Sequence, residues 1–227
     1  MSLVNLVNVD YSVGGPLLLE KVDLAIEALD TCASLASWSH PMKTLHRALR
    51  GFVGYYTGDR RATLTAMSDE EWNTPTMTPA GQDSIGRFMR IRTFDSWMHE
   101  QDIRESVARP APDAALQKPE ARLSLDEIET MMGFVVAKRG GAPDGARVEI
   151  QLTGPMARTI RVAVDGRAAV VPDFGGAEPT TVIRMDGWQF TRLCGGRPLG
   201  AVRPVVIEFE GDAEVGHRIV ENLGYVI

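Results

Sequence analysis

The sequence predicts a chain that is helical in its first part and mixed α+β in its second part. Before about residue 138, apolar residues recur every three to four positions, which is typical of amphipathic helices. After that point the period changes to two, and Val148, Ile150 and Leu152 alternate with polar residues. A run of helices followed by short alternating strands indicates two folded parts in one chain, first α and then α+β.

The changes in pattern also predict domain boundaries. Residues 1–16 show little periodicity and are expected to form a loosely ordered lead-in. A helical bundle is expected over residues 17–108. Prolines bracket a run of small residues over 109–119, which we interpret as a linker. The smaller α+β domain is expected over residues 120–227, and a chain of this length suits two such domains.

In the helical part, prolines and polar turns separate the expected helices. Pro41 ends the first helix, because proline disfavours helix at the residue before it. Ser68 and Glu71 have the spacing of a capping box that opens a short turn. Thr74–Pro79 is interpreted as a loop. The expected helices are residues 17–36, 42–56, 60–67 and 82–107.

In the second part, turn and cap signals define the elements. Ser124 and Glu127 have the spacing of another capping box, which predicts a helix from 124 to about 138. Asp165-Gly166 is typical of a hairpin turn. We interpret Gly195-Gly196-Arg197 as the loop that ends a helix rather than as an anion-binding turn. The expected strands are residues 148–152, 160–164, 168–171, 180–185 and 205–209, and the expected later helices are 186–193 and 212–223.

Composition and charge argue against several classes of protein. The chain is 44% hydrophobic and 24% charged, which is ordinary for a globular protein. A net charge of −6 and the lack of a basic run argue against nucleic-acid binding. Cys32 and Cys194 form no CxxC motif, and Cys194 is expected to be a buried structural thiol. Without a secretory signal or a membrane-spanning apolar run, we expect a cytoplasmic protein that does not bind membranes.

The helix expected over residues 82–107 carries the most informative side chains. Asp95 and His99 are four residues apart, so they project from the same helix face, one turn apart. A carboxylate and an imidazole in this arrangement can hold a divalent metal. Asp102 follows three residues after His99 and could orient its imidazole. On a helical wheel, all three fall among apolar residues, so we expect them to face the core, where they need partners. Those apolar residues are Phe88, Ile91, Met98 and Ile103.

Alternatives to a metal site stay open. Asp95 and His99 could instead form a buried ion pair that holds the helix to its neighbour. A metal needs a third protein ligand, for which His46 is the candidate, and the alternative is that His46 is solvated. Asp102 could form a salt bridge to Arg92 or to another helix instead of orienting His99.

The stretch from about Arg60 to Arg109 resembles the mycothiol-dependent maleylpyruvate isomerase family. The likeness rests on Thr78-Pro79-Ala80-Gly81 and on Arg92-Thr93-Phe94-Asp95-Ser96-Trp97-Met98-His99-Glu100-Gln101-Asp102-Ile103-Arg104. The second part is similar to the sterol-carrier-like domain that often follows, through Val164-Asp165-Gly166, Phe190, Leu193, Gly196-Arg197 and Gly211-Asp212. The family-like sequence begins at about Thr57, so we interpret the N-terminus before it as atypical.

The resemblance implies a fold and a set of ligands. The expected fold is a DinB-like helical bundle followed by a small sterol-carrier-like α+β domain. In this actinobacterial family the bundle binds a divalent metal, usually zinc, through one early histidine and a carboxylate–histidine pair. Asp95 and His99 match that pair, and His46 is the candidate for the early histidine. Mycothiol would be the thiol cofactor, and Arg104 is a candidate to meet the thiol or an anionic substrate.

The implied function is a metal-dependent enzyme that uses mycothiol to isomerise a small molecule or to transfer a thiol. The metal would lower the pKa of the thiol, and the thiolate would add to a substrate double bond, permit rotation and leave. The alternative is a non-catalytic ligand-binding or interaction protein with an incomplete metal site. In that case the C-terminal domain would bind an apolar or amphipathic molecule.

Overall fold

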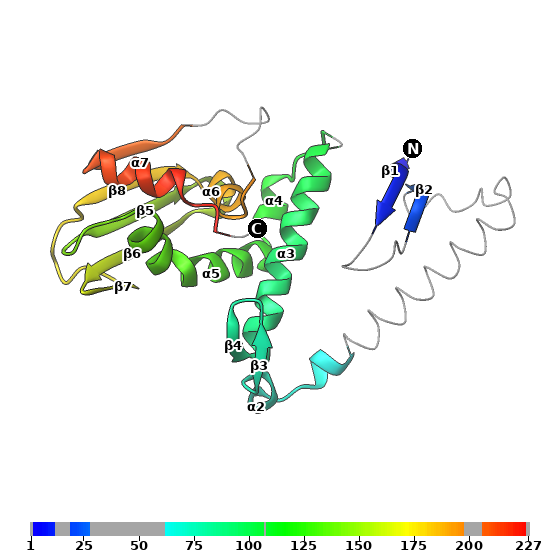
Figure 1. Cartoon of the computed structure of the whole chain (residues 1–227), viewed down its shortest axis with the longest axis horizontal. Coiled ribbons are helices and arrows are strands. Elements are labelled where there is room, and N and C mark those ends of the chain that lie inside the picture. The colour runs from blue at the N-terminus through cyan, green and yellow to red at the C-terminus, as the bar shows by residue number, and fades with distance from the viewer. Residues whose placement is uncertain (1, 12–18, 28–61, 107, 198–205, 226–227) are drawn as a thin grey trace, which may run out of the picture. The chain divides into compact units, whose positions relative to one another are not determined.

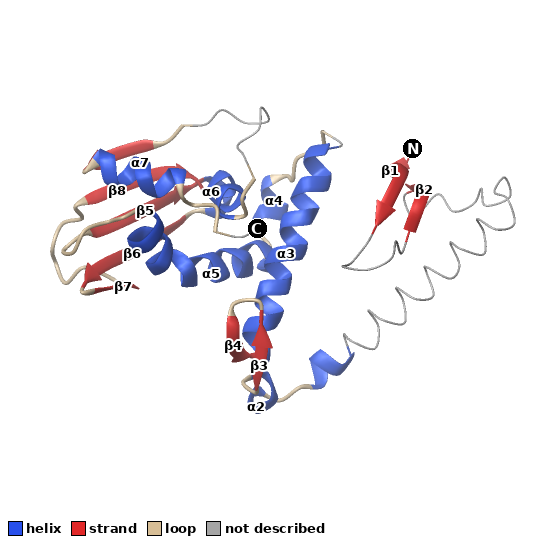
Figure 2. Ribbon diagram, in the orientation of Figure 1, coloured by secondary structure: helices blue, strands red, loops and turns tan. Residues whose placement is uncertain are grey.

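A computed structural model describes residues 2–11, 19–27, 62–106, 108–197 and 206–225 (Figure 1). The chain divides into two compact units, residues 1–69 and 70–227. The helix expected over residues 42–56, with His46, lies outside the described residues. The DinB-like bundle therefore stays a prediction, whereas the mixed α+β character of the C-terminal part is confirmed (Figure 2).

The first unit contains two strands where a lead-in and a helix were expected. β1 (Ser2–Tyr11) pairs with β2 (Leu19–Glu27) in antiparallel orientation. The expectation of a loosely ordered lead-in is therefore wrong for Ser2–Tyr11. The expectation of a helix over residues 17–36 is wrong for Leu19–Glu27, and its remainder lies outside the described residues.

The sequence of β2 explains why a helix was expected there, because its apolar residues fit both the spacing of a helix and the alternation of a strand. Val22, Leu24 and Ile26 alternate with polar or small residues, which suits a strand as well as the helical spacing does. The ladder places Leu24 opposite Leu6 and Ile26 opposite Val4. Pairing with a second β-prone segment thus decides between the two patterns, and a reading of one segment alone cannot detect it.

A hairpin precedes the long helix of the second unit. β3 (Pro75–Thr78) and β4 (Gly81–Ser84) pair in antiparallel orientation where the loop Thr74–Pro79 was expected. Thr78 pairs with Gly81, and the Thr78 hydroxyl donates to the Gly81 carbonyl at 2.7 Å. The prolines that suggested a loop stand at the first strand position and in the turn, where proline is tolerated.

Helices flank the hairpin on both sides in the sequence. Residues 62–66 are helical, within the helix expected over 60–67, and α2 (Asp69–Trp72) is the short turn expected after Ser68. The long helix is confirmed as α3 (Ile85–Ser106), which starts where β4 ends. Its buried residues are Phe94, Trp97, Met98 and Gln101.

The expected linker is partly helical and packed. α4 (Asp113–Leu116) lies within residues 109–119, and Leu116 is almost fully buried. α5 (Pro119–Phe134) then starts before the expected residue 124, and it continues as the π-helical η2 (Val135–Arg139). Pro119 at the first helical position is the start signal that the capping-box interpretation missed.

The Ser124–Glu127 capping box is wrong. Ser124 lies inside α5, and its hydroxyl donates to the Glu120 carbonyl at 2.8 Å. Glu127 instead accepts hydrogen bonds from Arg87 and Arg90 on α3. Ser124 and Glu127 therefore have the spacing of a capping box without capping a helix. Ser124 forms a hydrogen bond within α5, and Glu127 forms ion pairs with α3.

The C-terminal part is built on a five-stranded mixed sheet with the order β7-β6-β5-β8-β9. Neighbours pair in antiparallel orientation except β5 and β8, which are parallel. The hairpin predicted at Asp165-Gly166 is confirmed, since Asp165 pairs with Arg167 and Gly166 has a φ of 62°. The strands are β5 (Arg147–Thr153), β6 (Arg158–Asp165), β7 (Arg167–Val170), β8 (Thr181–Asp186) and β9 (Glu208–Gly211).

The two faces of the sheet differ in polarity, as the alternating pattern predicts. One face is buried with α5 in a continuous hydrophobic core, and the other carries ion pairs such as Arg161–Glu149 at 2.7 Å and Arg184–Glu208 at 2.9 Å. The buried strand residues include Val148, Ile150, Leu152, Ile160, Val162 and Ile183.

Two capped helices complete this part. α6 (Gly187–Cys194) starts after Asp186, whose carboxylate accepts from the Gln189 amide at 3.0 Å. α7 (Ala213–Glu221) starts after Asp212 in the same way. β9 lies further along the chain than the expected residues 205–209. No described helix is long and apolar enough to cross a membrane.

Candidate functional site

A groove of about 760 Å³ lies between α3, α5, the turn of the β3–β4 hairpin and the chain near the C-terminus. Most of its wall is apolar, and a small number of ionisable side chains interrupt it. This composition is typical of sites for small molecules. Apolar residues of the wall are Phe88, Ile91, Phe94, Met98, Met131 and Tyr225, and its ionisable residues are Arg92, Asp95, His99, Glu127 and Arg197.

The structure brings Asp95 and His99 together on the wall of this groove. His99 Nε2 lies 3.4 Å from Asp95 Oδ1, as the spacing of four residues predicts. Their side chains are 61% and 68% exposed. The expectation that they face the core is therefore wrong for the described structure. The helical wheel was centred on the wrong arc, since Ile103 is exposed and the buried stripe runs through Trp97 and Gln101.

The Asp95–His99 geometry suits two ligands of one metal. In a tetrahedral zinc site, donors about 2.1 Å from the metal are about 3.4 Å from each other. An exposed ion pair one helical turn long would have the same distance, so the distance alone does not decide between them. The described residues contain no cluster of three or more metal-ligating side chains. A third ligand would have to come from elsewhere, and His46 lies outside the described residues.

Asp102 lies between His99 and two arginines of the C-terminal part. Its Oδ2 is 3.5 Å from His99 Nδ1 and 2.8 Å from the guanidinium of Arg197, and its Oδ1 is 2.7 Å from Arg192. Of the two salt bridges considered from the sequence, the one to Arg92 is wrong, and the one to another helix is confirmed by Arg192 on α6. Burial alone would raise the pKa of Asp102, but hydrogen bonds from Arg197 and Arg192 outweigh it and lower that pKa.

Arg104 occupies a different part of the helix surface. Its guanidinium donates to Glu100 at 2.8 Å, one turn back on α3, and Arg104 does not line the groove. A role in binding the thiol or the substrate stays a prediction for this residue. Such an exposed pair stabilises a helix only slightly.

Two arginines of the groove were not singled out as site residues from the sequence. Arg92 is exposed and forms no ion pair within the described part of the chain. Arg197 follows α6, in the segment interpreted only as a helix-ending loop, and it reaches the groove while bonded to Asp102. Arg92 lies one helical turn before Asp95 and Ser96, a spacing that could have drawn attention to it.

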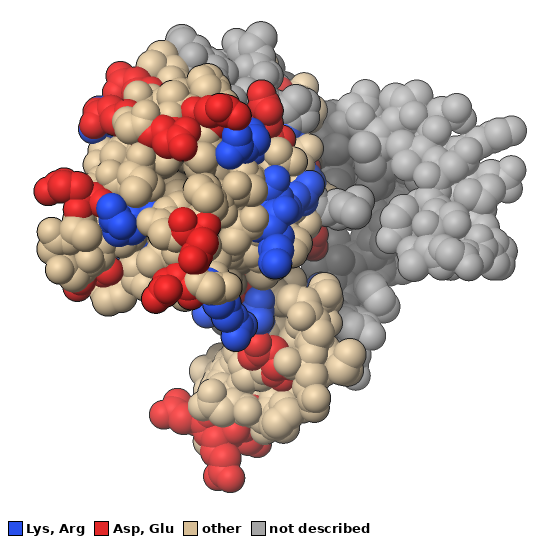
Figure 3. Space-filling model, turned by 60° about the vertical axis from the view of Figure 1, so that its left-hand side comes forward, with Lys and Arg blue, Asp and Glu red and all other residues tan. Residues whose placement is uncertain are grey.

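The end of the groove near α5 is held by a buried carboxylate. Glu127 accepts from Arg90 at 2.8 Å and from Arg87 at 3.3 Å, and its side chain is 5% exposed. Figure 3 shows basic side chains where the arm formed by α3 and the hairpin meets the C-terminal body. The ion pairs of Glu127 with Arg87 and Arg90 hold α3 against α5 and so set the width of the groove.

Tyr225 lines the groove and is half-buried, and its amide donates to the carbonyl of Cys194, which is fully buried. Burial raises the pKa of both the Tyr225 phenol and the Cys194 thiol. The expectation that Cys194 is a buried structural thiol is confirmed. A thiol with a raised pKa is a poor nucleophile, so the described residues supply no reactive cysteine to the groove.

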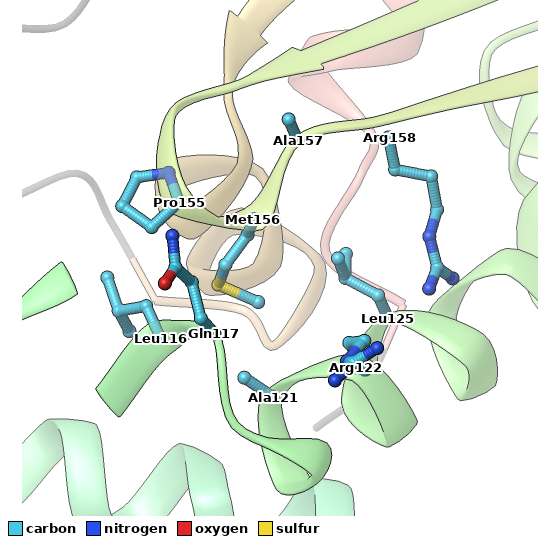
Figure 4. A pocket seen from close by; sticks show the side chains of 9 residues that line it. All are labelled: Leu116, Gln117, Ala121, Arg122, Leu125, Pro155, Met156, Ala157 and Arg158. Atoms are coloured by element: carbon cyan, nitrogen blue, oxygen red, sulfur yellow. The ribbon is translucent and has the colours of Figure 1, made fainter. Parts of the chain in front are cut away.

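A second, smaller cavity of about 440 Å³ lies within the C-terminal part, between the start of α5 and η3 (Gly154–Met156) (Figure 4). Its floor includes the buried residues Leu116, Leu125 and Met156, and the side chains of Arg122 and Arg158 lie at its edge. Asp126 and Glu129 pair with Arg158.

Two sequence models of protein domains match the chain. The mycothiol maleylpyruvate isomerase N-terminal domain matches residues 28–104, and the MDMPI C-terminal domain matches residues 122–218. Together they cover most of the chain, with a boundary near the expected linker. The first match starts at residue 28, so the likeness extends further toward the N-terminus than the expected Thr57. No curated protein and no solved structure is significantly similar to the chain.

Proposed function

The chain belongs to the mycothiol maleylpyruvate isomerase family, and from this premise we propose that it is a metal-dependent enzyme that uses mycothiol. It would isomerise a small anionic molecule or transfer a thiol to it. The observation that carries the proposal is the groove, whose wall places the Asp95–His99 pair beside arginines and apolar side chains.

Asp95 and His99 would hold the metal, with His46 as the proposed third ligand. When bound, a divalent metal such as zinc would lower the pKa of the mycothiol thiol and favour its nucleophilic thiolate. The protein would contribute the ligands and their orientation. The contact between Asp102 and His99 Nδ1 supports a role for Asp102 in orienting the imidazole.

The remaining groove residues suit an anionic substrate. Arg92 has no carboxylate partner among the described residues, so its guanidinium is available to bind a carboxylate of the substrate. Phe88 and Ile91 would exclude water from the reacting carbons. A small unsaturated acid would satisfy both features, and the proposed activity would be cytoplasmic.

The proposal is tested by measuring metal content and thiol-dependent activity on the same preparations. Mass spectrometry of the untagged wild type should find a divalent metal in equimolar amount, and His99→Ala should lose it. His217→Ala is the matched control, because His217 lies on α7, packed against the Phe209 ring and outside the groove. An unchanged metal content in His99→Ala, or no metal in the wild type even after zinc is added, would refute the metal site.

Mycothiol-dependent activity requires its own measurement. With mycothiol present, the wild type should convert maleylpyruvate or a related unsaturated acid, and Arg92→Gln should raise KM with a smaller effect on kcat. A KM that does not change in Arg92→Gln would contradict the role of Arg92, whether or not the metal is bound.

The second candidate function is non-catalytic binding of an amphipathic molecule in the C-terminal part. The smaller cavity favours it, because an apolar floor with arginines at the edge suits an acid with an apolar body (Figure 4). This candidate predicts ligand binding that Leu125→Arg abolishes and His99→Ala leaves unchanged.

A further inference from the structure

Most ionisable side chains of the groove wall already have partners within the protein. Glu127 accepts from Arg90 at 2.8 Å and from Arg87 at 3.3 Å. Arg197 donates through Nε and Nη2 to the two carboxylate oxygens of Asp102, at 3.3 and 2.8 Å. The charges of Glu127 and Arg197 are therefore compensated before any ligand enters the groove.

Arg92 differs from these residues. It is exposed on α3, it lines the groove, and it forms no ion pair within the described part of the chain. One turn further along the helix, Asp95 faces His99 at 3.4 Å. Among the described residues, the groove thus offers one uncompensated guanidinium, which suits one anionic group. A second anionic group would lose its water in the groove without gaining a counter-charge, and that loss is costly.

The rest of the wall favours an apolar ligand. Phe88 and Ile91 on α3 and Met131 on α5 are half-buried, so each keeps apolar surface that a ligand can cover. Each methylene group that is fully buried against such surface tightens binding by up to about fourfold. The groove volume of about 760 Å³ lies within the range of sites for drug-sized molecules. The groove therefore has room and apolar surface for a larger body than that of a small diacid.

We propose that the ligand of this groove is an acid with one carboxylate and an apolar body, rather than a small diacid. Arg92 binds the carboxylate, and Phe88, Ile91 and Met131 cover the apolar body. The idea that this body contains the double bond to which a thiol adds rests on the proposed function, whereas the binding preference does not.

The preference is measured by calorimetry with two unreactive probes of equal carbon number, octanoate and octanedioate, on the full-length chain. Octanoate should bind about tenfold more tightly, because the second carboxylate of octanedioate stays in water and keeps its neighbouring methylene groups from being buried. From butanoate to octanoate, each added methylene should tighten binding by about two- to fourfold. No binding of octanoate, equal affinity for the two probes, or no gain with chain length would overturn the proposal.

Two arginine variants locate the carboxylate. Arg92→Gln should weaken octanoate binding by about tenfold, because it removes a charge-assisted hydrogen bond. Arg122→Gln tests the smaller cavity, since Arg122 is an exposed helical arginine at the edge of that cavity. It should leave octanoate binding unchanged. A loss in Arg122→Gln with none in Arg92→Gln would place the ligand in the smaller cavity and overturn the proposal.

Two further variants locate the apolar body. Met131→Gln keeps the approximate shape of the side chain and should reduce the gain in affinity per methylene. Leu123→Gln is the matched control, because Leu123 is 40% exposed on the same helix and outside the groove. Equal gains in Met131→Gln and Leu123→Gln would contradict the role of the wall. Circular dichroism verifies that each variant folds.

Inhibition by octanoate separates this preference from the proposed function. If octanoate binds as expected but the wild type shows neither bound metal nor mycothiol-dependent activity, the proposed function fails and the preference stands. If mycothiol-dependent activity on a diacid is found and octanoate does not compete with that substrate, the preference fails and the proposed function stands.

Discussion

Replacing Glu127 by glutamine should destabilise the protein, because Glu127 joins α3 to α5. The carboxylate accepts from Arg90 at 2.8 Å and from Arg87 at 3.3 Å, and its side chain is 5% exposed. Glutamine keeps the shape and one acceptor oxygen. It removes the negative charge that both guanidinium groups face.

The size of the effect follows from burial. Breaking a fully buried ion pair by removing one partner costs about 3–5 kcal/mol. Arg87 and Arg90 are 21% and 30% exposed, so water compensates part of their lost contact. We therefore expect Glu127→Gln to lower the free energy of unfolding by about 2 kcal/mol. For a chain of this size, that corresponds to a fall in Tm of roughly 4–8 °C.

Urea denaturation followed by circular dichroism measures this free energy, and calorimetry measures Tm. The matched control is Glu100→Gln, which removes an exposed ion pair with Arg104 on the same helix. It should cost no more than about 0.5 kcal/mol. A loss in Glu127→Gln as small as that of the control would refute the reasoning that this buried carboxylate holds α3 to α5.

Other changes have equally definite expectations. The pKa of Asp83 is lowered, chiefly by its hydrogen bond to Arg87, so its stabilising effect is present above the unfolded-state pKa and is lost as pH falls through the folded-state value. Urea titrations should find that, between about pH 5 and pH 2, the free energy of unfolding falls less in Asp83→Asn than in the wild type. An equal fall in both proteins would contradict this expectation. Tyr225→Phe should change stability by less than about 0.5 kcal/mol or increase it, because the buried hydroxyl has no hydrogen-bond partner among the described residues; a larger loss in urea would reveal a partner. Gly211→Ala should lower Tm more than Gly175→Ala, since both have a positive φ but only at Gly211 would a Cβ lie within 2.2 Å of a backbone oxygen; equal shifts would contradict the steric argument.

Much of the C-terminal part could be predicted from local pattern. Its strands alternate between a buried and a charged face, so Val148 and Ile150 mark β5 without any knowledge of their neighbours. Asp186 and Asp212 mark helix starts in the same local way. The elements that were missed, β2 and the β3–β4 hairpin, depend on pairing with another segment, which periodicity within one segment does not contain.

The candidate site likewise has features that local sequence pattern predicts and features that it does not predict. The contact between Asp95 and His99 follows from a spacing of four on one helix, so the sequence predicts it directly. The exposure of that pair does not follow, because apolar residues such as Phe88 and Ile91 line an open groove instead of the core. A helical wheel that treats every apolar residue as buried therefore assigns the wrong face of α3 to the core.

The partners of Asp102 illustrate why the rest of the site required the structure. From the sequence, any arginine could neutralise this carboxylate, and Arg92 on the same helix was the nearest candidate considered. The actual partners, Arg192 and Arg197, are about ninety residues away and come from the other domain. Helix geometry excludes Arg92, because a spacing of ten residues separates the two side chains by about 15 Å along the axis. Asp102 therefore lies 3.5 Å from His99 Nδ1 on one side and pairs with two arginines of the C-terminal domain on the other, so under the proposed function one carboxylate would both bind that domain and orient His99.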